Sequence, residues 1–417
     1  MASMPRLAVS VRLLGALCPV LALSQFLRTT LAVIAPEMVR DLDISAEALG
    51  LLTGAFFIAS ALMQIPVGVL LDRFGPRRLV PTLLGITVAG AFLFASAHSV
   101  VLLIAGQFLI GVGCSGVFMG GLVTISRWYP RDRFATIASI ALAISNIGPV
   151  LSGTPFAAVT QAIGWRGAYE AIAVITAALA LLVFIAIRDA PPGHPFHSRA
   201  TESFVTALRS VGHVLSDRRI FGVLAIGFVV YSSTIAIRGL WAGPFLADVY
   251  HLGALDRGNV LVAMSLALIA YISIIGPLDR VVDSRKRVVA GTALVFVAIM
   301  AVMAFSPGMG FWTTVVLLCL SLVGGAANVH ILAHGRAFFS DQYVGRALTT
   351  VNGTIFVGVG VIQVATGFII GAFPTAPGGG APEIAYRAVF GFLAVVVLLA
   401  VLFYARVEDA RPSQDNA

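Results

Sequence analysis

The stretch Gly68-Val69-Leu70-Leu71-Asp72-Arg73-Phe74-Gly75-Pro76-Arg77-Arg78 places four charged residues between two long apolar runs. A weaker copy, Gly276-Pro277-Leu278-Asp279-Arg280, stands between two later apolar runs and is followed by Arg285 and Lys286. Short basic loops of this kind are typical of the cytoplasmic connection between two membrane-spanning helices. The stretch therefore predicts a chain that crosses a membrane more than once.

The composition of the whole chain supports the same prediction. Apolar residues make up 59% of the 417 residues, charged residues make up 11%, and the mean hydropathy is +0.98. A soluble protein of this length could not cover its surface with so few charges. We predict an all-α membrane protein whose apolar runs form twelve spans, at residues 12–36, 46–71, 79–97, 100–126, 134–157, 168–187, 220–243, 257–278, 288–306, 311–335, 347–373 and 385–405.

Residues 188–219 form a long polar stretch, and their Pro, Ser and charged side chains indicate a linker. This stretch divides the predicted spans into two groups of six. We therefore predict an N-terminal six-helix bundle at residues 1–187, a cytoplasmic linker at 188–219 and a C-terminal six-helix bundle at 220–417.

The basic residues are distributed unevenly between the two sides of the membrane. With the N-terminus inside, the cytoplasmic segments hold 21 of the 27 Lys and Arg residues, and the spans hold two. The outer loops hold the other four, Arg40, Arg166, Arg257 and Arg387. Because basic residues accumulate on the cytoplasmic side, we predict a bacterial inner-membrane protein with both termini in the cytoplasm. The clustering also explains the net charge of +8 without a nucleic-acid partner.

Matching residues recur at a nearly constant separation along the chain. Separations of 207 to 209 positions join Pro36 to Pro244, Asp41 to Asp248, Gly68 to Gly276, Asp72 to Asp279, Arg77 to Arg285 and Arg127 to Arg336. A parallel repeat of six plus six spans is typical of transporters that bind their substrate at the interface between the two halves.

The stretch from Gly68 to Arg78 resembles the signature loop of the major facilitator superfamily, Gly-x-x-x-Asp-Arg-x-Gly-x-Arg-Arg. The resemblance extends over essentially the whole chain, through the spans, the linker, the repeat and the Gly-Trp-Arg at 164–166. It implies a fold of two pseudo-symmetric six-helix bundles. It also implies a secondary active transporter, rather than an enzyme, that works by alternating access.

The chemistry of its residues suggests a role for the signature loop independently of the resemblance. Gly68 lets two helices approach closely, and the Asp72 carboxylate can meet the positive end of a helix dipole and nearby guanidinium groups. The resemblance implies that such a cluster is a conformational latch that favours the outward-open state. The residues expected in it are Gly68, Asp72, Arg73, Arg77, Arg78, Asp279 and Arg280. For Arg77 and Arg78, orientation of the loop toward the cytoplasm is also a sufficient role.

Two patterns of proton-coupled antiporters in this superfamily are not met. The fourth span has Gln107 where those antiporters have an Arg, and Gly148-Pro149 with Gly153 matches the motif of their fifth span only in part. Both departures count against a typical drug/proton antiporter.

Two arginines, Arg28 and Arg238, lie at the depth of the hydrocarbon core, whereas all 19 Asp and Glu residues fall in loops or at the ends of the predicted spans. A cation at this depth costs several kcal/mol, so it is usually functional or paired. Two guanidinium groups can bind a carboxylate or a phosphate through paired hydrogen bonds. The pattern resembles the organophosphate/phosphate exchangers of the superfamily, and we predict a central site for a small organic anion. Helical spacing adds four neighbours to this site, Gln25, Tyr231, Thr234 and Trp241.

Other interpretations of the two arginines stay open. Either side chain could extend toward the membrane surface or pair with an outer carboxylate such as Glu37, Glu170 or Asp248. The alternative functions are efflux or uptake of a cation, drug, metal or vitamin-like neutral compound. A membrane sensor with the same fold but without transport is a further alternative.

His330 and His334 lie four residues apart, so both imidazoles face the same side of a helix. This spacing suits a metal ion or a proton relay, but the sequence offers no third ligand, and we predict no metal centre and no cofactor. The expected partners are a small-molecule substrate, membrane lipid and a coupling proton or counter-anion. We expect the protein to be a monomer.

Overall fold

The computed structural model describes residues 7–191, 204–376 and 380–414, and in these ranges the chain contains helices and no strand. Ten helical runs are long and apolar enough to cross a membrane. An eleventh is obtained if α3 (Ala46–Leu62) and α4 (Gln64–Phe74), which are bent by 47°, count as one span. The chain is therefore a multi-pass membrane protein.

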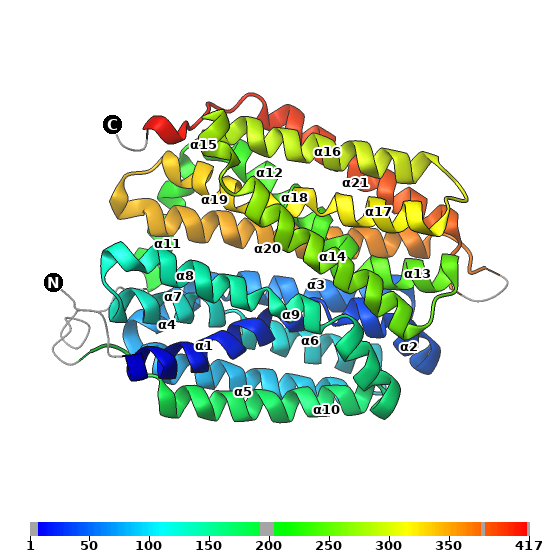
Figure 1. Cartoon of the computed structure of the whole chain (residues 1–417), viewed down its shortest axis with the longest axis horizontal. Coiled ribbons are helices and arrows are strands. Elements are labelled where there is room, and N and C mark those ends of the chain that lie inside the picture. Colours follow the sequence, from blue (N-terminus) through cyan, green and yellow to red (C-terminus); the bar gives the residue numbers. More distant parts are fainter. Residues whose placement is uncertain (1–6, 192–203, 377–379, 415–417) are drawn as a thin grey trace.

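The N-terminal group of helices occupies the lower half of Figure 1. After α1 (Leu7–Leu27) and α2 (Leu31–Leu42) come α3 and α4, then α5 (Pro76–Ala95), α6 (Val100–Cys114), α7 (Val117–Trp128), α8 (Arg131–Ser145), α9 (Ile147–Leu151) and α10 (Thr154–Ala186).

The C-terminal group occupies the upper half of Figure 1. It consists of α12 (Ile220–Ala236), the π-helix η2 (Ile237–Trp241), α13 (Ala242–Tyr250), α14 (Ala254–Ile275), α15 (Leu278–Val282), α16 (Arg285–Phe305), α17 (Phe311–Ser321), α18 (Val323–Ala326), α19 (Asn328–Ala337), α20 (Asp341–Gly371), α21 (Glu383–Tyr404) and η3 (Pro412–Gln414). Between the groups, α11 (Phe204–Ser216) forms a helix inside the stretch that the sequence predicted only as a linker.

Helix α10 runs through the connection between the fifth and sixth predicted spans. Gly164 inside it has a non-helical backbone (φ 73°, ψ 165°), so α10 consists of two helices joined at a kink. Glycine tolerates this positive φ without steric strain. The preceding apolar helix, Thr136–Leu151, is shorter than a span. These features explain why a count by helix length gives fewer spans than the sequence predicted.

The first long helix of each group is interrupted near its middle. The turn at residues 28–30 separates α1 from α2. There the side chains of Thr29 and Thr30 donate to the backbone carbonyls of Phe26 and Leu27, at 3.1 and 3.2 Å. Such bonds compete with the regular helical pattern. In the C-terminal group the interruption is the π-helix η2, a distortion frequent at functional sites.

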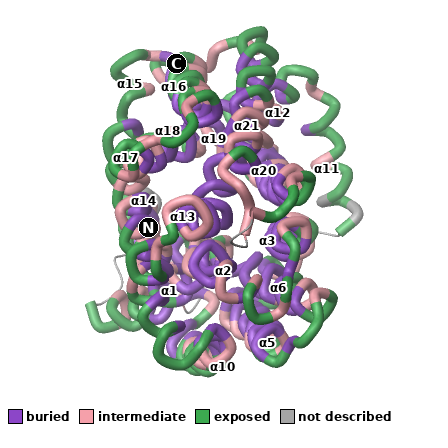
Figure 2. Tube along the Cα trace, turned by 90° about the vertical axis from the view of Figure 1, so that its right-hand side faces the viewer, coloured by how far each residue is buried: buried purple, intermediate pink, exposed green. Residues whose placement is uncertain are grey.

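The two groups are in direct contact at the end of the molecule where α2 and α13 lie side by side (Figure 2). A Cβ atom on Gly243 of α13 would lie 1.6 Å from the carbonyl oxygen of Ala32 on α2. On the neighbouring pair, α3 and α20, a Cβ atom on Gly50 would lie 2.6 Å from the carbonyl oxygen of Gln363. Small residues therefore let the backbones touch here, and the structure is closed at this α2–α13 end.

At the same end, an aspartate accepts side-chain hydrogen bonds in each group. Asp41 accepts hydrogen bonds from Arg166 and Trp165, while Arg166 also donates to the carbonyl oxygen of Ala97. The hydrogen bond from Arg166 holds the pKa of the Asp41 carboxyl below its usual value. This cluster ties α2 to the connection inside α10.

The C-terminal group has a related arrangement in which Asp248 accepts from Tyr386 and not from an arginine. The hydroxyl of Tyr386 donates to Asp248 at 2.6 Å, and Arg387 donates to the carbonyl oxygen of Ala304 at 2.8 Å. Asp248 and Ala304 each follow their N-terminal counterparts by 207 positions.

At the opposite end, an aspartate caps one helix in each group. Asp189 accepts from the backbone N–H of Arg77 in the first turn of α5, at 2.8 Å. Asp409 accepts from the backbone N–H of Lys286 in the first turn of α16 at 3.1 Å, and from the Ser284 hydroxyl at 2.5 Å. A carboxylate at a helix N-terminus satisfies free N–H groups and complements the helix dipole.

Buried positions concentrate where helices face one another, and exposed positions lie on the periphery of the bundle (Figure 2). Many of the exposed residues are large and apolar. Exposed fractions reach 82% for Phe305 and 75% for both Trp312 and Val101. In water so extensive an apolar surface would be unfavourable, but in a bilayer it faces lipid tails.

Candidate functional site

Arg28 stands at the break between α1 and α2, where the two groups face each other. Its guanidinium carbon lies 5.1 Å from the centre of the Phe356 ring on α20. The side chain is half-buried, its buried Nε atom has no hydrogen-bond partner, and none of the ion pairs among the described residues involves it. A ring face attracts a cation but does not neutralise it. Arg28 therefore offers hydrogen-bond donors and an uncompensated charge.

Arg238 in the π-helix is 2% exposed and is held by neutral groups. Its Nε and Nη2 atoms donate to the Ser265 hydroxyl on α14, at 3.0 and 2.8 Å. Nη2 also donates to the N-terminal group, to the carbonyl oxygen of Pro149 at 2.7 Å and to the hydroxyl of Ser152 at 3.3 Å. Nη1 is buried and has no hydrogen-bond partner among the described residues.

The predicted neighbours of the two arginines are placed differently from one another. Gln25 and Tyr231 are half-buried. Trp241 is buried and donates to the Thr366 hydroxyl of α20 at 2.7 Å. Thr234 is buried against α18, where a Cβ atom on Gly324 would lie 3.2 Å from its Oγ1. Trp241 and Thr234 thus join helices within the C-terminal group, and substrate contact by any of the four stays a prediction.

A buried hydroxyl network adjoins the break that carries Arg28. The Thr30 hydroxyl lies 2.8 Å from the Tyr169 hydroxyl, and the Gln107 side chain donates to the same Tyr169 oxygen at 3.5 Å. All three residues are buried. Thr29 extends the polar groups toward Arg238, because its hydroxyl lies 2.7 Å from that of Ser152. The sequence identified Gln107 but not its partners, because single hydroxyl groups in apolar helices have no distinctive pattern.

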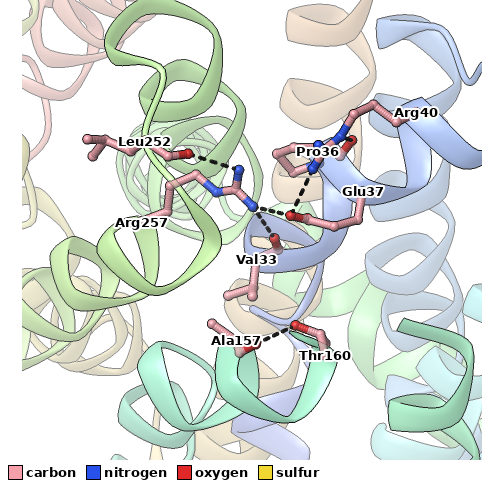
Figure 3. A network of polar contacts seen from close by, with 8 residues as sticks. All are labelled: Val33, Pro36, Glu37, Arg40, Ala157, Thr160, Leu252 and Arg257. Carbon is pink, nitrogen blue, oxygen red and sulfur yellow. Dashed lines mark hydrogen bonds and ion pairs between the residues drawn. The ribbon is translucent and has the colours of Figure 1, made fainter. Parts of the chain in front are cut away.

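A second link between the groups lies at the α2–α13 end (Figure 3). Arg257 on α14 donates to Glu37 on α2 at 2.5 Å, and also to the carbonyl oxygens of Leu252 and Val33 at 3.3 and 3.5 Å. Arg257 is 3% exposed, although the sequence placed it in an outer loop. Glu37, considered as a partner for Arg28 or Arg238, instead pairs with Arg257 and with Arg40, whose Nη2 lies 3.3 Å away.

The sequence profile of the Major Facilitator Superfamily matches residues 17–361 of the chain. The chain belongs to the major facilitator superfamily. It is therefore a membrane transporter of solutes and not an enzyme.

Three relatives illustrate the range within the superfamily. The nitrite extrusion protein of Bacillus subtilis is 24% identical over 73% of this chain and 74% of its own length. A probable nitrate transporter NarT of Staphylococcus carnosus is 22% identical over 88% of this chain and 90% of its own. A probable sulfoacetate transporter SauU of Cupriavidus necator is 26% identical over 50% of this chain and 47% of its own.

Two solved transporter structures have the same fold. A bacterial homologue of the human lysosomal transporter Spinster aligns with a TM-score of 0.73 and 16% identity, over 98% of this chain and 100% of that chain. The nucleoside transporter NupG aligns with a TM-score of 0.74 and 14% identity, over 95% and 98%.

The superfamily signature loop is located at the end opposite α2 and α13. Gly68 would accept a Cβ atom without a contact within 4 Å, and the side chains of Asp72, Arg73 and Arg78 are exposed. Arg77 donates through Nε to the carbonyl oxygen of Phe184 at 3.2 Å. In this conformation the Asp189 carboxylate, not Asp72, caps α5, so the latch role of Asp72 stays a prediction.

The C-terminal copy of the loop is packed more tightly. Asp279 is half-buried, with Arg285 Nε 3.7 Å and His330 Nε2 3.8 Å from its carboxylate oxygens, while Arg280 is exposed. His334 has other partners. Its Nε2 bonds the carbonyl oxygen of Glu408 at 2.9 Å, and its Nδ1 lies 2.5 Å from the Tyr404 hydroxyl.

These contacts decide the tautomer of His334. A carbonyl oxygen only accepts, so Nε2 carries the proton and Nδ1 accepts from Tyr404. Both nitrogens of His334 are therefore occupied, whereas those of His330 have no hydrogen bond. The two imidazoles do not act as a pair in this conformation. No group of three or more His, Cys, Asp or Glu residues suited to a metal ion occurs in the part of the chain that is described.

Proposed function

We propose that this transporter moves a small organic anion across the bacterial inner membrane. The observation that carries the proposal is the half-buried Arg28 guanidinium, which has no carboxylate partner and lies at a helix break between the two groups. A charged side chain within a bilayer costs about 2.5–3.5 kcal/mol, and a bound anion would offset much of that cost. Broken helices are a recurrent feature of substrate sites in transporters.

The names of the relatives support an anion as substrate. The nitrite, nitrate and sulfoacetate proteins are all named for anions. The Phe356 ring against Arg28 and the nearby Phe57, whose ring centre is 6.1 Å from that of Phe356, favour an organic anion over a fully hydrated inorganic one.

We further propose the topology expected from the sequence, with twelve spans and both termini in the cytoplasm. The kink at Gly164 supports dividing α10 between the fifth and sixth spans. The paired contacts of Asp41 and Asp248, and those of Asp189 and Asp409, support a pseudo-symmetric pair of six-helix bundles at 1–187 and 220–417, with 188–219 as the linker. In this topology the α2–α13 end is the outer end.

Transport would proceed by alternating access, with the two bundles rocking about the arginines. The structure, closed at the proposed outer end, would then represent the state that is closed to the outside. We propose a monomer in contact with membrane lipid, with Asp72 as part of a latch at the cytoplasmic end. A proton or a counter-anion would drive the movement.

Purified protein in proteoliposomes tests the proposal. Nitrite, nitrate and sulfoacetate serve as probes in uptake assays and in thermal-shift titrations, because a ligand raises the stability of the state it binds. We expect sulfoacetate, the organic probe, to be transported, and Arg28→Gln to reduce its uptake at least tenfold. Transport of nitrite or nitrate alone would make the substrate an inorganic anion instead. The matched control is Arg218→Gln, which removes an exposed arginine in the segment before α12. Wild-type transport by Arg28→Gln would disprove the anion site, and a solute that is transported only as a cation or neutral compound would disprove the substrate class.

A further inference from the structure

Arg238 and Arg257 both reach from the C-terminal group to acceptors on the N-terminal group, but those acceptors differ. Arg257 meets the Glu37 carboxylate, so its charge is compensated. Arg238 meets the carbonyl oxygen of Pro149 and the hydroxyl of Ser152, which are neutral. Of these two arginines, Arg238 therefore keeps a positive charge available to an anion, and its Nη1 atom remains without a hydrogen bond among the described residues.

The Pro149 carbonyl is available to Arg238 because the helix is broken beyond it. In a continuous helix this oxygen would accept from the backbone N–H of Gly153. Gly153 instead donates to the carbonyl of Val150 at 3.1 Å and has a non-helical backbone (φ −90°, ψ −121°). The Pro149 oxygen accepts from Arg238 and from the hydroxyls of Ser152 and Ser265, at 2.7, 2.9 and 3.2 Å.

These bonds depend on the closed contact between the two groups. Pro149 and Ser152 belong to the N-terminal group, whereas Arg238 and Ser265 belong to the C-terminal group and would move together. Opening of the outer end would separate α14 from α9 and α10 and would remove the Pro149 and Ser152 oxygens from Arg238. The buried guanidinium would then need new acceptors.

We propose that Arg238 alternates between these neutral oxygens and the substrate. With the outer end open, Arg238 and Ser265 bind the incoming anion, because a guanidinium bonds an anion more strongly than a carbonyl. When that end closes, Pro149 and Ser152 replace the anion, which passes to Arg28. The two arginines thus bind the anion one after the other and do not hold it at the same time. This inference rests on the proposed anion transport and names the residues that bind the anion on its outer side.

A protein locked with its outer end closed distinguishes binding by the two arginines in sequence from binding by both at the same time. The Thr154 hydroxyl donates to the Asn259 side chain at 2.7 Å across the α10–α14 contact. Cysteines are introduced at both positions in a chain whose native Cys18, Cys114 and Cys319 are replaced by alanine, and disulfide formation on oxidation is checked by mass spectrometry. In the oxidised protein we expect Arg28→Gln to weaken binding of nitrate or sulfoacetate at least tenfold in a thermal-shift titration. Arg238→Gln should change that binding less than threefold.

The same variants are then compared without the lock. After reduction, Arg238→Gln should lower uptake from the outside at least tenfold. It should also open the outer end more often, which is measured with Ala32→Cys in the cysteine-free chain and a membrane-impermeant thiol reagent. Ala32 is fully buried, so labelling requires opening. The milder Ser265→Ala should raise the labelling rate in the same direction, and Arg218→Gln should leave it unchanged.

The outcomes are distinct. If Arg238→Gln weakens binding to the locked protein as strongly as Arg28→Gln, both arginines bind the anion at the same time and the sequential scheme is wrong. The proposal of anion transport would still stand. Labelling unchanged by both Arg238→Gln and Ser265→Ala would also overturn the scheme, because the closed-state bonds would then not hold the outer end. If no probe binds any form of the protein, the anion function itself fails, and the scheme fails with it.

Discussion

Arg257 and Glu37 form a 2.5 Å ion pair between the two groups of helices, while the second carboxylate oxygen of Glu37 is buried without a hydrogen-bond partner. The arginine is 3% exposed, but the Glu37 side chain is 26% exposed. The pair is therefore shielded on one side and reachable by water on the other. Its contribution should lie between that of a surface ion pair and that of a fully buried one.

Glu37→Gln should favour separation of α2 from α14 at the outer end, because it leaves the buried Arg257 guanidinium without a carboxylate. A cost of about 1–3 kcal/mol to the closed state is expected from the partial exposure of the pair. The measurement is the rate of labelling of Ala32→Cys from the outside, which should rise. The double variant Glu37→Gln/Arg257→Gln should recover part of the loss. Equal labelling of Ala32→Cys with and without Glu37→Gln would show that the ion pair does not hold the outer end closed.

Phe356→Leu should weaken anion binding about three- to tenfold through loss of the aromatic face, a contact worth about 0.5–2 kcal/mol. The ring lies against the Arg28 guanidinium and limits its orientations. Thermal-shift titration with the transported anion measures the change. Phe92→Leu, which alters a phenylalanine that is 45% exposed, is the control and should bind normally. An unchanged affinity in Phe356→Leu would leave the ring with a packing role only.

Asp189→Ala should affect stability, whereas Asp72→Asn should affect the transport rate. Asp189 caps α5, so its removal should lower the free energy of unfolding by about 1 kcal/mol. Asp72 is exposed in this conformation, and Asp72→Asn should leave the melting temperature unchanged but slow transport at least fivefold if the latch forms in the other state. Melting curves and uptake rates of the two variants are compared directly. A normal uptake rate in Asp72→Asn would count against the latch.

His334→Ala should destabilise the protein more than His330→Ala. His334 is fully buried and bonds both Tyr404 and Glu408, whereas the ring nitrogens of His330 have no hydrogen bond. Loss of a buried, doubly bonded ring is expected to cost about 2–4 kcal/mol. Thermal unfolding is the measurement, repeated with EDTA and with Zn²⁺ because the four-residue spacing suits a metal. A stabilisation by Zn²⁺ that disappears in either variant would restore the metal interpretation.

The sequence was sufficient for the membrane fold because apolar runs and basic loops directly reflect the bilayer. It also pointed to Arg28 and Arg238, because a charge in an apolar run is conspicuous. It did not reveal that Pro149 and Ser152 hold Arg238, since carbonyl and hydroxyl groups are present in almost every helix. Which oxygens are free depends on where the helix breaks.

Residues near the predicted boundaries were harder to place. Arg257 was assigned to an outer loop because it stands at the start of the predicted span 257–278, yet α14 begins three residues earlier and buries it. Asp189 lies in the predicted linker, and its role depends on the chain folding back to α5. A contact between residues more than a hundred positions apart cannot be inferred from local periodicity.

The close approach of Gly243 to Ala32 offers a practical route to the conformation that this structure does not represent. A methyl group at position 243 would overlap the backbone of α2 in the closed arrangement, and it would meet no such obstacle once the two helices separate. Gly243→Ala would therefore enrich the opened form without altering either arginine. That single-residue variant is a candidate for cryo-electron microscopy with an antibody fragment that recognises the exposed outer face.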